Sequence, residues 1–211
     1  ERLTPRGNLR ISLPLSFGLR RIVPLLPAFQ STYPEISLAL DFSDRHVNLI
    51  DEGIDLSIRI IARLDPNDVA RRLGESRLLT VASPDYLSRH GRPAHPAELS
   101  AHSCLGYSAK ANNRPLSFRI DGRMENVHVP FRLQANNGDA LAAAAAQGLG
   151  ITMQPDFIVA DGLASGALVT VLEDFEPAPL GIYALLPSNR YLPHRVRVLI
   201  DFLAKALVSA A

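Results

Sequence analysis

The sequence predicts an α/β fold, and three features lead to this prediction. The chain has 211 residues, of which 47% are apolar and 20% are charged, so it can bury a sizeable core. Two strand-helix-strand units fit within the first 60 residues, which indicates a parallel sheet with helices on its faces. The spacing of the elements changes after Arg77. The length is therefore compatible with one large domain or two smaller lobes.

The first strand-helix unit begins with residues 8–15, "NLRISLPL", where apolar and polar residues alternate as in a strand. Ser16 follows as a candidate N-cap. Apolar residues then recur at helical spacing at Ile22, Leu25, Leu26 and Phe29. Pro24 and Pro27 interrupt this pattern, and proline inside a helix removes a hydrogen bond. We therefore expect a helix that begins late or is kinked.

The second unit begins with the strand at residues 36–42, "ISLALDF". Ser43 is a candidate cap for a short helix that runs through Ile50, and Gly53 is its expected stop. Residues 55–60, "DLSIRI", are the third expected strand.

Beyond Arg77, local signals predict shorter elements. Residues 77–83, "RLLTVAS", form an expected strand, and Pro84 opens a short helix that Gly91 closes. Residues 117–129 predict a hairpin, because its centre, Asp121–Gly122, is a dipeptide that favours tight turns.

The stretch 133–155, "LQANNGDALAAAAAQGLGITMQP", predicts a strand, a polar turn, a helix rich in alanine, a glycine pair and another strand. A helix beginning at Pro155 and strands at 167–172 and 181–187 should follow. A C-terminal amphipathic helix is marked by Val196, Leu199, Ile200, Leu203 and Leu207.

Composition excludes several functional classes. The 22 Lys and Arg nearly balance the 21 Asp and Glu, so the chain lacks the basic excess typical of nucleic-acid binding. We expect no membrane span, because no apolar run approaches the required length. A single cysteine, Cys104, allows no internal disulfide and fits a reducing compartment, and we expect it on a strand as a buried small residue. These features predict a cytoplasmic protein, although a mature secreted protein would look the same.

The sequence offers little support for catalysis or for a cofactor. Ser165 lies in "GLASGAL", which is not a nucleophile elbow. Gly148 and Gly150 follow a helix and precede a strand, the reverse of the dinucleotide fingerprint, so helix termination by Gly148 explains them better. The histidines lack the close pairing typical of zinc sites, and His90, His95 and His102 should be surface residues in connecting loops. We expect no catalytic residue, cofactor or metal.

Several polar residues could bind a ligand, but each also has a purely structural interpretation. Asn136 and Asn137 precede the alanine helix, whose first turn could hold a carboxylate or could simply be capped by them. Ser16 and Ser43 follow strands, where ligands of open α/β sheets bind, and could cap helices, bind a ligand or do both. Arg59 could pair with an acidic ligand, or equally with Asp41 or Asp55. Gln154, at the end of a strand, is a weaker polar candidate.

Six phrases, in this order and spacing, resemble the effector-binding domain of LysR-type transcriptional regulators. They span residue 7 to roughly residue 207 and are "GNLRISLPLSFG", "RIVPLLPAFQSTYPEISLAL", "NLIDEGIDLSIRI", "RRLGESRLLTVASPDYLSRHGRP", "AAAQGLGITMQPDFI" and "GALVTVL". The family's regulators begin with a winged helix-turn-helix and a linker helix, and residues 1–7 resemble only the end of that linker. The resemblance therefore implies a fragment that senses a ligand without binding DNA itself.

The resemblance implies a two-lobed fold like that of type 2 periplasmic binding proteins. Lobe I would comprise residues 8–79 plus 188–211, and lobe II residues 80–187, with 77–83 and 181–187 as the crossover strands. An effector would bind in the cleft between the lobes. The residues expected to bind it are Ser16, Ser43, Arg59, Asn136, Asn137 and Gln154.

The same resemblance implies the partners. A small-molecule effector, which Arg59 and the helix starts suggest is an anion, would change how the protein assembles. The domain would form a homodimer, and the full-length protein a tetramer that contacts DNA through its N-terminal domain. Two other functions remain as alternatives, a solute-binding protein of a transport system and a small enzyme that uses the same cleft.

Overall fold

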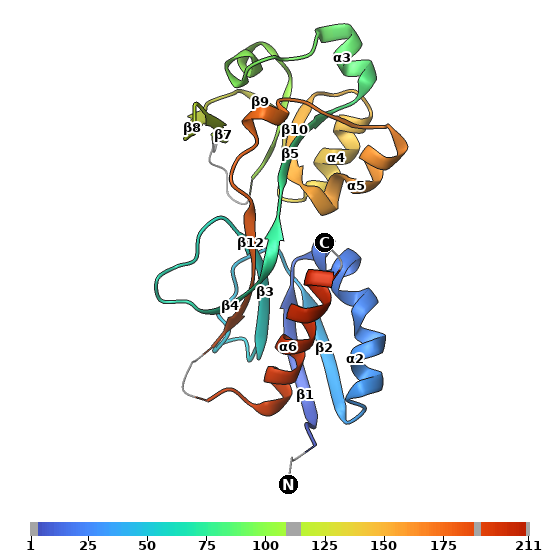
Figure 1. Ribbon diagram of the computed structural model, residues 1–211, viewed down its shortest axis with the longest axis vertical. Helices are drawn as coiled ribbons and strands as arrows, with labels where there is room; N and C mark the ends of the chain where they lie inside the picture. Colours follow the sequence, from blue (N-terminus) through green and yellow to red (C-terminus); the bar gives the residue numbers. More distant parts are fainter. Residues whose placement is uncertain (1–3, 109–114, 188–190, 210–211) are drawn as a thin grey trace. The chain divides into compact units, whose positions relative to one another are not determined.

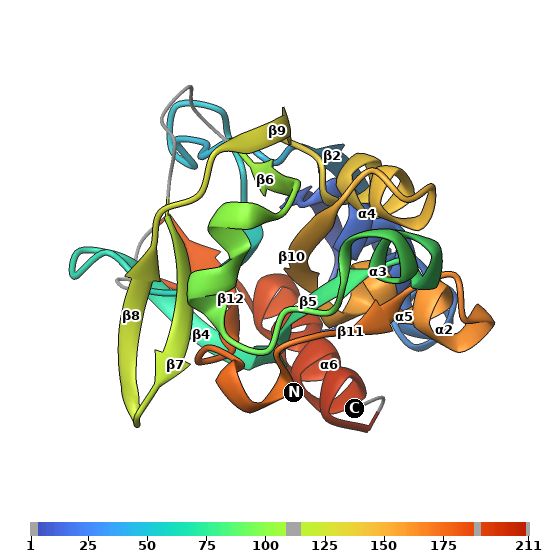
Figure 2. The same ribbon diagram turned by 90° about the horizontal axis from the view of Figure 1, so that it is seen from above.

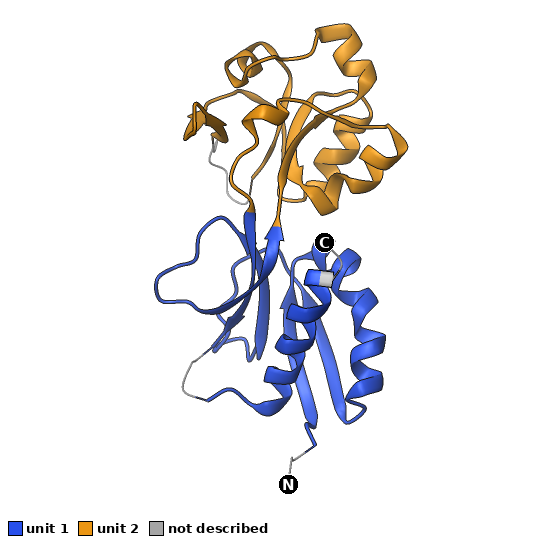
Figure 3. Ribbon diagram, in the orientation of Figure 1, with its two compact units in different colours: residues 1–75, 180–211 blue, residues 76–179 orange. Residues whose placement is uncertain are grey.

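The computed structural model describes residues 4–108, 115–187 and 191–209 (Figure 1). It divides the chain into two compact units: unit 1 contains residues 1–75 and 180–211, and unit 2 contains residues 76–179 (Figure 3). The second boundary between the units lies between residues 179 and 180, before the strand at 180–186. The family resemblance had implied a lobe boundary after residue 187. Pairing explains this difference, because that strand belongs to the sheet of unit 1. Residues 1–3 of the expected linker and the expected boundary residue 188 lie outside the described ranges.

Unit 1 is built on a five-stranded mixed sheet. Its strand order is β2 (Ile36–Phe42), β1 (Gly7–Leu13), β3 (Leu56–Ile61), β12 (Leu180–Leu186) and β4 (Val69–Ser76). The first three strands are parallel, as predicted, with β1 in register with β2 from Gly7 opposite Ile36 to Leu13 opposite Phe42. β12 is antiparallel to β3. Residues far apart in sequence therefore share one sheet.

The helical segment after β1 is irregular because of its prolines. It consists of α1 (Leu15–Phe17), a π-helical turn (Gly18–Ile22), a 3₁₀ turn (Val23–Leu25) and α2 (Leu26–Thr32). Pro24 and Pro27 lie at the starts of the last two pieces, where a missing N–H is tolerated. The prolines thus coincide with interruptions of the helix, and the regular helix α2 begins only at Leu26, but Ser16 is not the N-cap. Pro14 holds that position, without a side-chain hydrogen bond, and Ser16 lies inside α1.

The C-terminal helix α6 (His194–Ser209) lies against β1 (Figure 1). The predicted apolar stripe is buried, with at most 5% of each side chain exposed: Val196, Leu199, Ile200, Leu203 and Leu207. Phe202 also packs edge to face on Phe29 of α2, with ring centroids 5.3 Å apart.

The helix predicted between Ser43 and Ile50 is absent, and this prediction is wrong. Side-chain oxygens compete with helical hydrogen bonds there, since Asn48 Oδ1 accepts the N–H groups of Ile50 and Asp51 at 3.2 Å. Gly53, the predicted stop, has φ +63° and ends a turn instead of a helix.

Unit 2 contains a second five-stranded sheet. The order is β11 (Val169–Thr170), β5 (Leu78–Ala82), β10 (Ile151–Pro155), β6 (Cys104–Tyr107) and β9 (Phe131–Ala135), and Figure 2 shows these strands side by side. β10, β6 and β9 are parallel, whereas β5 is antiparallel to β10.

The predicted hairpin forms a separate two-stranded sheet in unit 2. Its strands are β7 (Leu116–Ile120) and β8 (Arg123–Val127). Asp121 and Gly122 at the turn have φ values of +49° and +77°, as the dipeptide signal predicts.

Local signals also set the ends of the other helical segments of unit 2. In α3 (Pro84–His90), Ser83 Oγ accepts the N–H of Tyr86 at 3.1 Å, and Gly91 has φ +82° after the last turn. α5 (Asp156–Ser165) begins directly after Pro155, as predicted. Short 3₁₀ turns occupy Pro96–Ala101 and Glu173–Phe175.

The alanine-rich helix is α4 (Gly138–Ala146). Asn137 Oδ1 caps its start by accepting the N–H of Ala140 at 3.0 Å. At its end, Gly148 has φ +81° and Leu149 N–H donates to the Ala144 carbonyl at 3.1 Å. This is a Schellman ending, so termination of the helix by Gly148 is confirmed.

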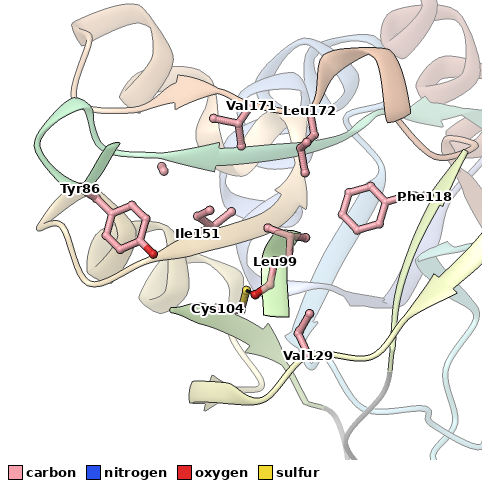
Figure 4. Packing of buried hydrophobic residues seen from close by; sticks show 9 residues of the cluster. Tyr86, Leu99, Cys104, Phe118, Val129, Ile151, Val171 and Leu172 are labelled. Atoms are coloured by element: carbon pink, nitrogen blue, oxygen red, sulfur yellow. Dashed lines mark hydrogen bonds between the residues drawn. The ribbon is translucent and has the colours of Figure 1, made fainter. Parts of the chain in front are cut away.

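The two faces of the sheet in unit 2 carry separate apolar clusters. Alternation along β6 places Cys104 in one cluster and Leu105 in the other. Figure 4 shows the cluster that contains Cys104, where Tyr86, Leu99, Phe118 and Ile151 are also buried. α4 and α5 cover the opposite face. The small side chains of α4 allow close packing there, since Leu141 and Ala145 are fully buried.

We predict that Gly150→Ala destabilises the protein by about 1–3 kcal/mol, because overpacking forces the backbone to move. A Cβ at Gly150 would lie 2.3 Å from the carbonyl oxygen of Ser103. Gly74→Ala is the matched control, since its Cβ would meet only Ile182 at 3.8 Å. Urea denaturation of both variants tests this prediction, and equal midpoints would contradict it.

Candidate functional site

Polar groups gather in unit 1 where the parallel strands β1 and β2 end. The loops that follow these strands are joined, because the N–H of Leu15 donates to Asp44 Oδ1 at 3.2 Å and the N–H of Ser43 donates to the Leu13 carbonyl at 2.8 Å. The carboxyl ends of strands are where open α/β sheets bind ligands. This edge is therefore the candidate site of unit 1.

Arg59 of β3 is buried at this edge and bridges β1 to the loop after β2. Its Nη1 donates to the carbonyls of Ser43 (3.0 Å) and Ile58 (3.1 Å). Its Nη2 donates to Ser12 Oγ (2.8 Å) and to the carbonyl of Arg45 (3.2 Å). The guanidinium thus holds the 43–45 loop in place.

The charge of Arg59 has no direct ion-pair partner in the described part of the chain. Asp55 was one of the two predicted salt-bridge partners of Arg59. Its Oδ2 accepts the backbone N–H of Arg10 instead, and its Oδ1 lies 3.9 Å from Arg195 Nη2. Burial lowers the pKa of Arg59, and the nearby carboxylates of Asp44 and Asp41 act in the opposite direction. Arginine stays protonated in proteins despite such shifts, so the edge carries a buried positive charge.

Both predicted serines lie near this edge. Ser16 is buried in α1, directly after Leu15, the first residue of this helix. Ser43 is half-buried, and its Oγ accepts the N–H of Arg45 at 3.3 Å. Two further serines at this edge, Ser12 and Ser57, were not predicted from the sequence, and they face each other in β1 and β3. Ser57 Oγ is buried and has no hydrogen-bond partner among the described residues.

The other predicted residues lie at the corresponding edge of the sheet in unit 2. Asn136 is exposed and Asn137 is half-buried, and both follow β9. Gln154 is buried near the end of β10, where its Nε2 donates to Thr152 Oγ1 at 2.9 Å. Its Oε1 lies close to Gly138, since a Cβ there would be 2.5 Å from it. The structure therefore brings Gln154 to the first turn of α4.

A polar cluster around Tyr86 was not anticipated. Tyr86 Oη accepts the N–H of Ser103 at 2.9 Å and lies 2.9 Å from His102 Nδ1, while the His90 ring stacks on the Tyr86 ring at 4.4 Å. His102 is half-buried, which corrects its prediction as a surface residue. Burial, aided by the charge of His90, lowers the pKa of His102. Loop composition predicted the polarity of these residues but not their shared aromatic partner.

The third histidine of these connections, His95, is also half-buried. Its ring packs on Phe175 with centroids 5.0 Å apart, and its Nδ1 accepts the N–H of Ala97 at 3.1 Å. Of the three histidines predicted at the surface, only His90 is exposed.

The cysteine and the potential metal ligands do not suggest a reactive site in the described part of the chain. Cys104 is on β6 and fully buried, as predicted, and burial raises the pKa of its thiol to about 11. Within residues 4–108, 115–187 and 191–209, no group of three or more His, Cys, Asp or Glu side chains could hold a metal ion.

Comparison with known proteins decides the family. The family model described as the LysR substrate binding domain matches residues 3–208. The chain belongs to the LysR substrate-binding domain family. The HTH-type transcriptional regulator DmlR of Escherichia coli (strain K12) is 34% identical over 205 residues, which cover 96% of this chain and 66% of DmlR. An uncharacterized HTH-type transcriptional regulator of Haemophilus influenzae is 34% identical over 192 residues, or 90% of this chain and 66% of the relative.

Solved structures agree with this assignment to the LysR family. The regulator CrgA from Neisseria meningitidis is 30% identical with a TM-score of 0.83, over 97% of this chain and 69% of that one. The regulatory domain of CrgA matches with a TM-score of 0.81 over 96% of this chain and all of that domain. These LysR regulatory domains have the type 2 periplasmic-binding-protein-like fold, which confirms the predicted fold class.

The LysR domain spans about two thirds, 66%, of the length of the curated relatives it matches. These relatives are transcriptional regulators, so the chain is the effector-binding domain of a LysR-type regulator. Among its described helices, none is both long and apolar enough to cross a membrane.

We predict that Arg59→Ala lowers the free energy of unfolding by about 2–4 kcal/mol, because it leaves buried carbonyl groups and Ser12 without their donor. Arg63→Ala is the control, since Arg63 is exposed beyond the end of β3. We expect this control to change stability by less than about 0.5 kcal/mol. Denaturant titration distinguishes the two, and a neutral Arg59→Ala would contradict the structural role of Arg59.

We predict that Cys104 reacts slowly with thiol reagents in the native protein. With a pKa of about 11, the thiolate fraction at pH 8 is on the order of 100-fold below that of an ordinary thiol, and burial slows access further. Reaction with an aromatic disulfide reagent, followed by absorbance with and without urea, measures this difference. Similar rates in both conditions would refute the prediction.

Proposed function

We propose that this domain senses a small anionic effector, such as a carboxylate, through polar groups at the carboxyl edges of its two sheets. The observation that carries this proposal is the buried charge of Arg59 at the carboxyl edge of the sheet of unit 1, which forms no ion pair with an acidic side chain among the described residues. Its four hydrogen bonds all go to uncharged oxygens, so an anion at this edge would gain from its charge. Ser16 and Ser43 would add hydroxyl groups there.

Unit 2 would contribute the start of α4. Helix N-termini carry partial positive charge and attract anions. Asn136 and Asn137 lie directly before this helix, and the Gln154 side chain reaches its first turn. These groups support the same ligand chemistry as Arg59.

The effector would act by shifting a conformational equilibrium. A ligand changes such an equilibrium only through its different affinities for the two states. In this proposal the domain forms a homodimer in the cytoplasm. The full-length regulator forms a tetramer that contacts DNA through an N-terminal domain. The relatives named above are transcriptional regulators, which favours this function over a transport protein or an enzyme.

We predict that at least one small organic acid raises the melting temperature of the domain, because a ligand that binds only the folded state stabilises it. A thermal-shift screen of mono- and dicarboxylates measures this effect. A ligand at about 100 times its dissociation constant contributes about 2.7 kcal/mol. An active acid should lose most of its effect in Ser43→Ala and in Asn137→Ser, a substitution that retains a capping oxygen.

Two further variants test the assignment of the effector-binding residues. Arg59→Lys retains the charge but not the planar donor geometry, so it should weaken the response without the full stability loss of Arg59→Ala. Ser165→Ala, at the end of α5, should leave the response unchanged. A full response in all of the site variants would refute the assignment, and a screen without any hit among the acids would refute the anionic effector.

A further inference from the structure

Unit 2 contains a cavity that involves none of the six residues assigned to the effector. It has a volume of about 520 Å³ and lies among α3, the segment before β6, β9 and the end of α4. This volume is within the usual range for small-molecule sites, which is about 300–1,000 Å³. Its lining includes Tyr86, His90, Ser103, Arg132, Gly148 and Leu149.

One wall of the cavity is formed by aromatic and polar side chains that contact one another. The Tyr86 ring is held by the N–H of Ser103 at its hydroxyl and by the stacked ring of His90. His90 Nδ1 lies 3.1 Å from the carbonyl oxygen of Tyr86, and a carbonyl only accepts, so Nδ1 carries the hydrogen. His90 Nε2 then remains as an acceptor, or as a donor when the ring is protonated.

Ser103 lines the same cavity, and its hydroxyl is buried in the wall. Its Oγ has no hydrogen-bond partner among the described residues. A buried polar atom without a partner costs about 1–3 kcal/mol. The close packing of Ser103 against Gly150 holds it in place, because a Cβ at Gly150 would lie 2.9 Å from this Oγ.

The charges around the cavity favour an anion on one side. Arg89 is already neutralised, since it donates to Asp85 Oδ2 at 2.8 Å and 3.1 Å and to the Gly148 carbonyl at 3.3 Å. Arg132 of β9 is exposed and, in the described ranges, forms no ion pair with an acidic side chain. Arg132 therefore leaves a positive charge at the cavity. Ala144 and Leu149 add apolar surface.

We propose that this cavity is a second ligand site, which binds a small organic anion. Arg132 would pair with the carboxylate or phosphate group, and the apolar part would lie against Ala144 and Leu149. The glycine pair makes room for the site. A side chain at Gly148 would meet Arg89 Nη2 at 2.8 Å, and one at Gly150 would displace Ser103.

Titration of the 211-residue chain with benzoate and, separately, with inorganic phosphate tests the proposal. Heteronuclear NMR should show saturable shifts at the Ser103 amide and the His90 ring for at least one of them below about 10 mM, the range of weak single-site binding. Shifts with benzoate alone would show that the apolar wall contributes, and shifts with both would show that the anionic group suffices. The absence of saturable shifts with both probes would overturn the proposal.

Charge reversal at two exposed arginines distinguishes binding at this cavity from non-specific electrostatic attraction of anions to the protein. Arg132→Glu should weaken binding by at least about tenfold, the loss expected when a charge-assisted pair becomes repulsive. Arg123→Glu makes the same change on the β7–β8 hairpin and should leave affinity within about twofold. An equal loss in both variants would overturn the site. Ser43→Ala should not affect this binding, so the result is independent of the effector proposed above.

Discussion

The pairing of β12 with β3 is the interaction on which the architecture depends. It joins Gly181–Leu185 to Ser57–Ile61 in antiparallel register, and it returns the chain to its first sheet after the whole of unit 2. α6 follows directly and buries its apolar stripe in unit 1. Without this pairing, the N-terminal strands would lack both a neighbouring strand and the helix that covers β1.

The position of β3 in the sheet of unit 1 explains why the Arg59 side chain is buried among hydrogen-bond acceptors. β3 lies between β1 and β12, so a side chain near its end is surrounded by other strands and by the loops after β1 and β2. The Arg59 guanidinium donates hydrogen bonds to carbonyl and hydroxyl oxygens, which do not neutralise its positive charge. In the proposed function, Arg59 would have both a structural and a binding role, because the residue that holds the 43–45 loop would also be the buried charge that an anion meets. In unit 2, the residue that caps α4, Asn137, does not line the cavity to which Arg132 and Ser103 belong.

Local chemistry predicted local structure well in this protein. Pro84, Asp121 with Gly122, and Gly148 each specify a backbone conformation through their own side chain or its absence, and each was predicted correctly from the sequence. The helix expected at residues 43–50 failed because Asn48 bonds its own neighbours and a distant residue, Arg59, takes the Ser43 carbonyl. Ser16 was wrongly predicted as a cap, because α1 already begins at Leu15 and Pro14 therefore holds the N-cap position.

The sequence by itself determined the family, the parallel strands at the start, the caps and turns, and the C-terminal amphipathic helix. These features depend on periodicity or on residues within a few positions of one another. Only the tertiary structure decided which strands share a sheet, which acceptors Arg59 meets, and that Tyr86, His90, Ser103 and Arg132 line one cavity. These residues come from α3, the segment before β6, and β9, and contacts between such distant elements leave no periodic signal in the sequence.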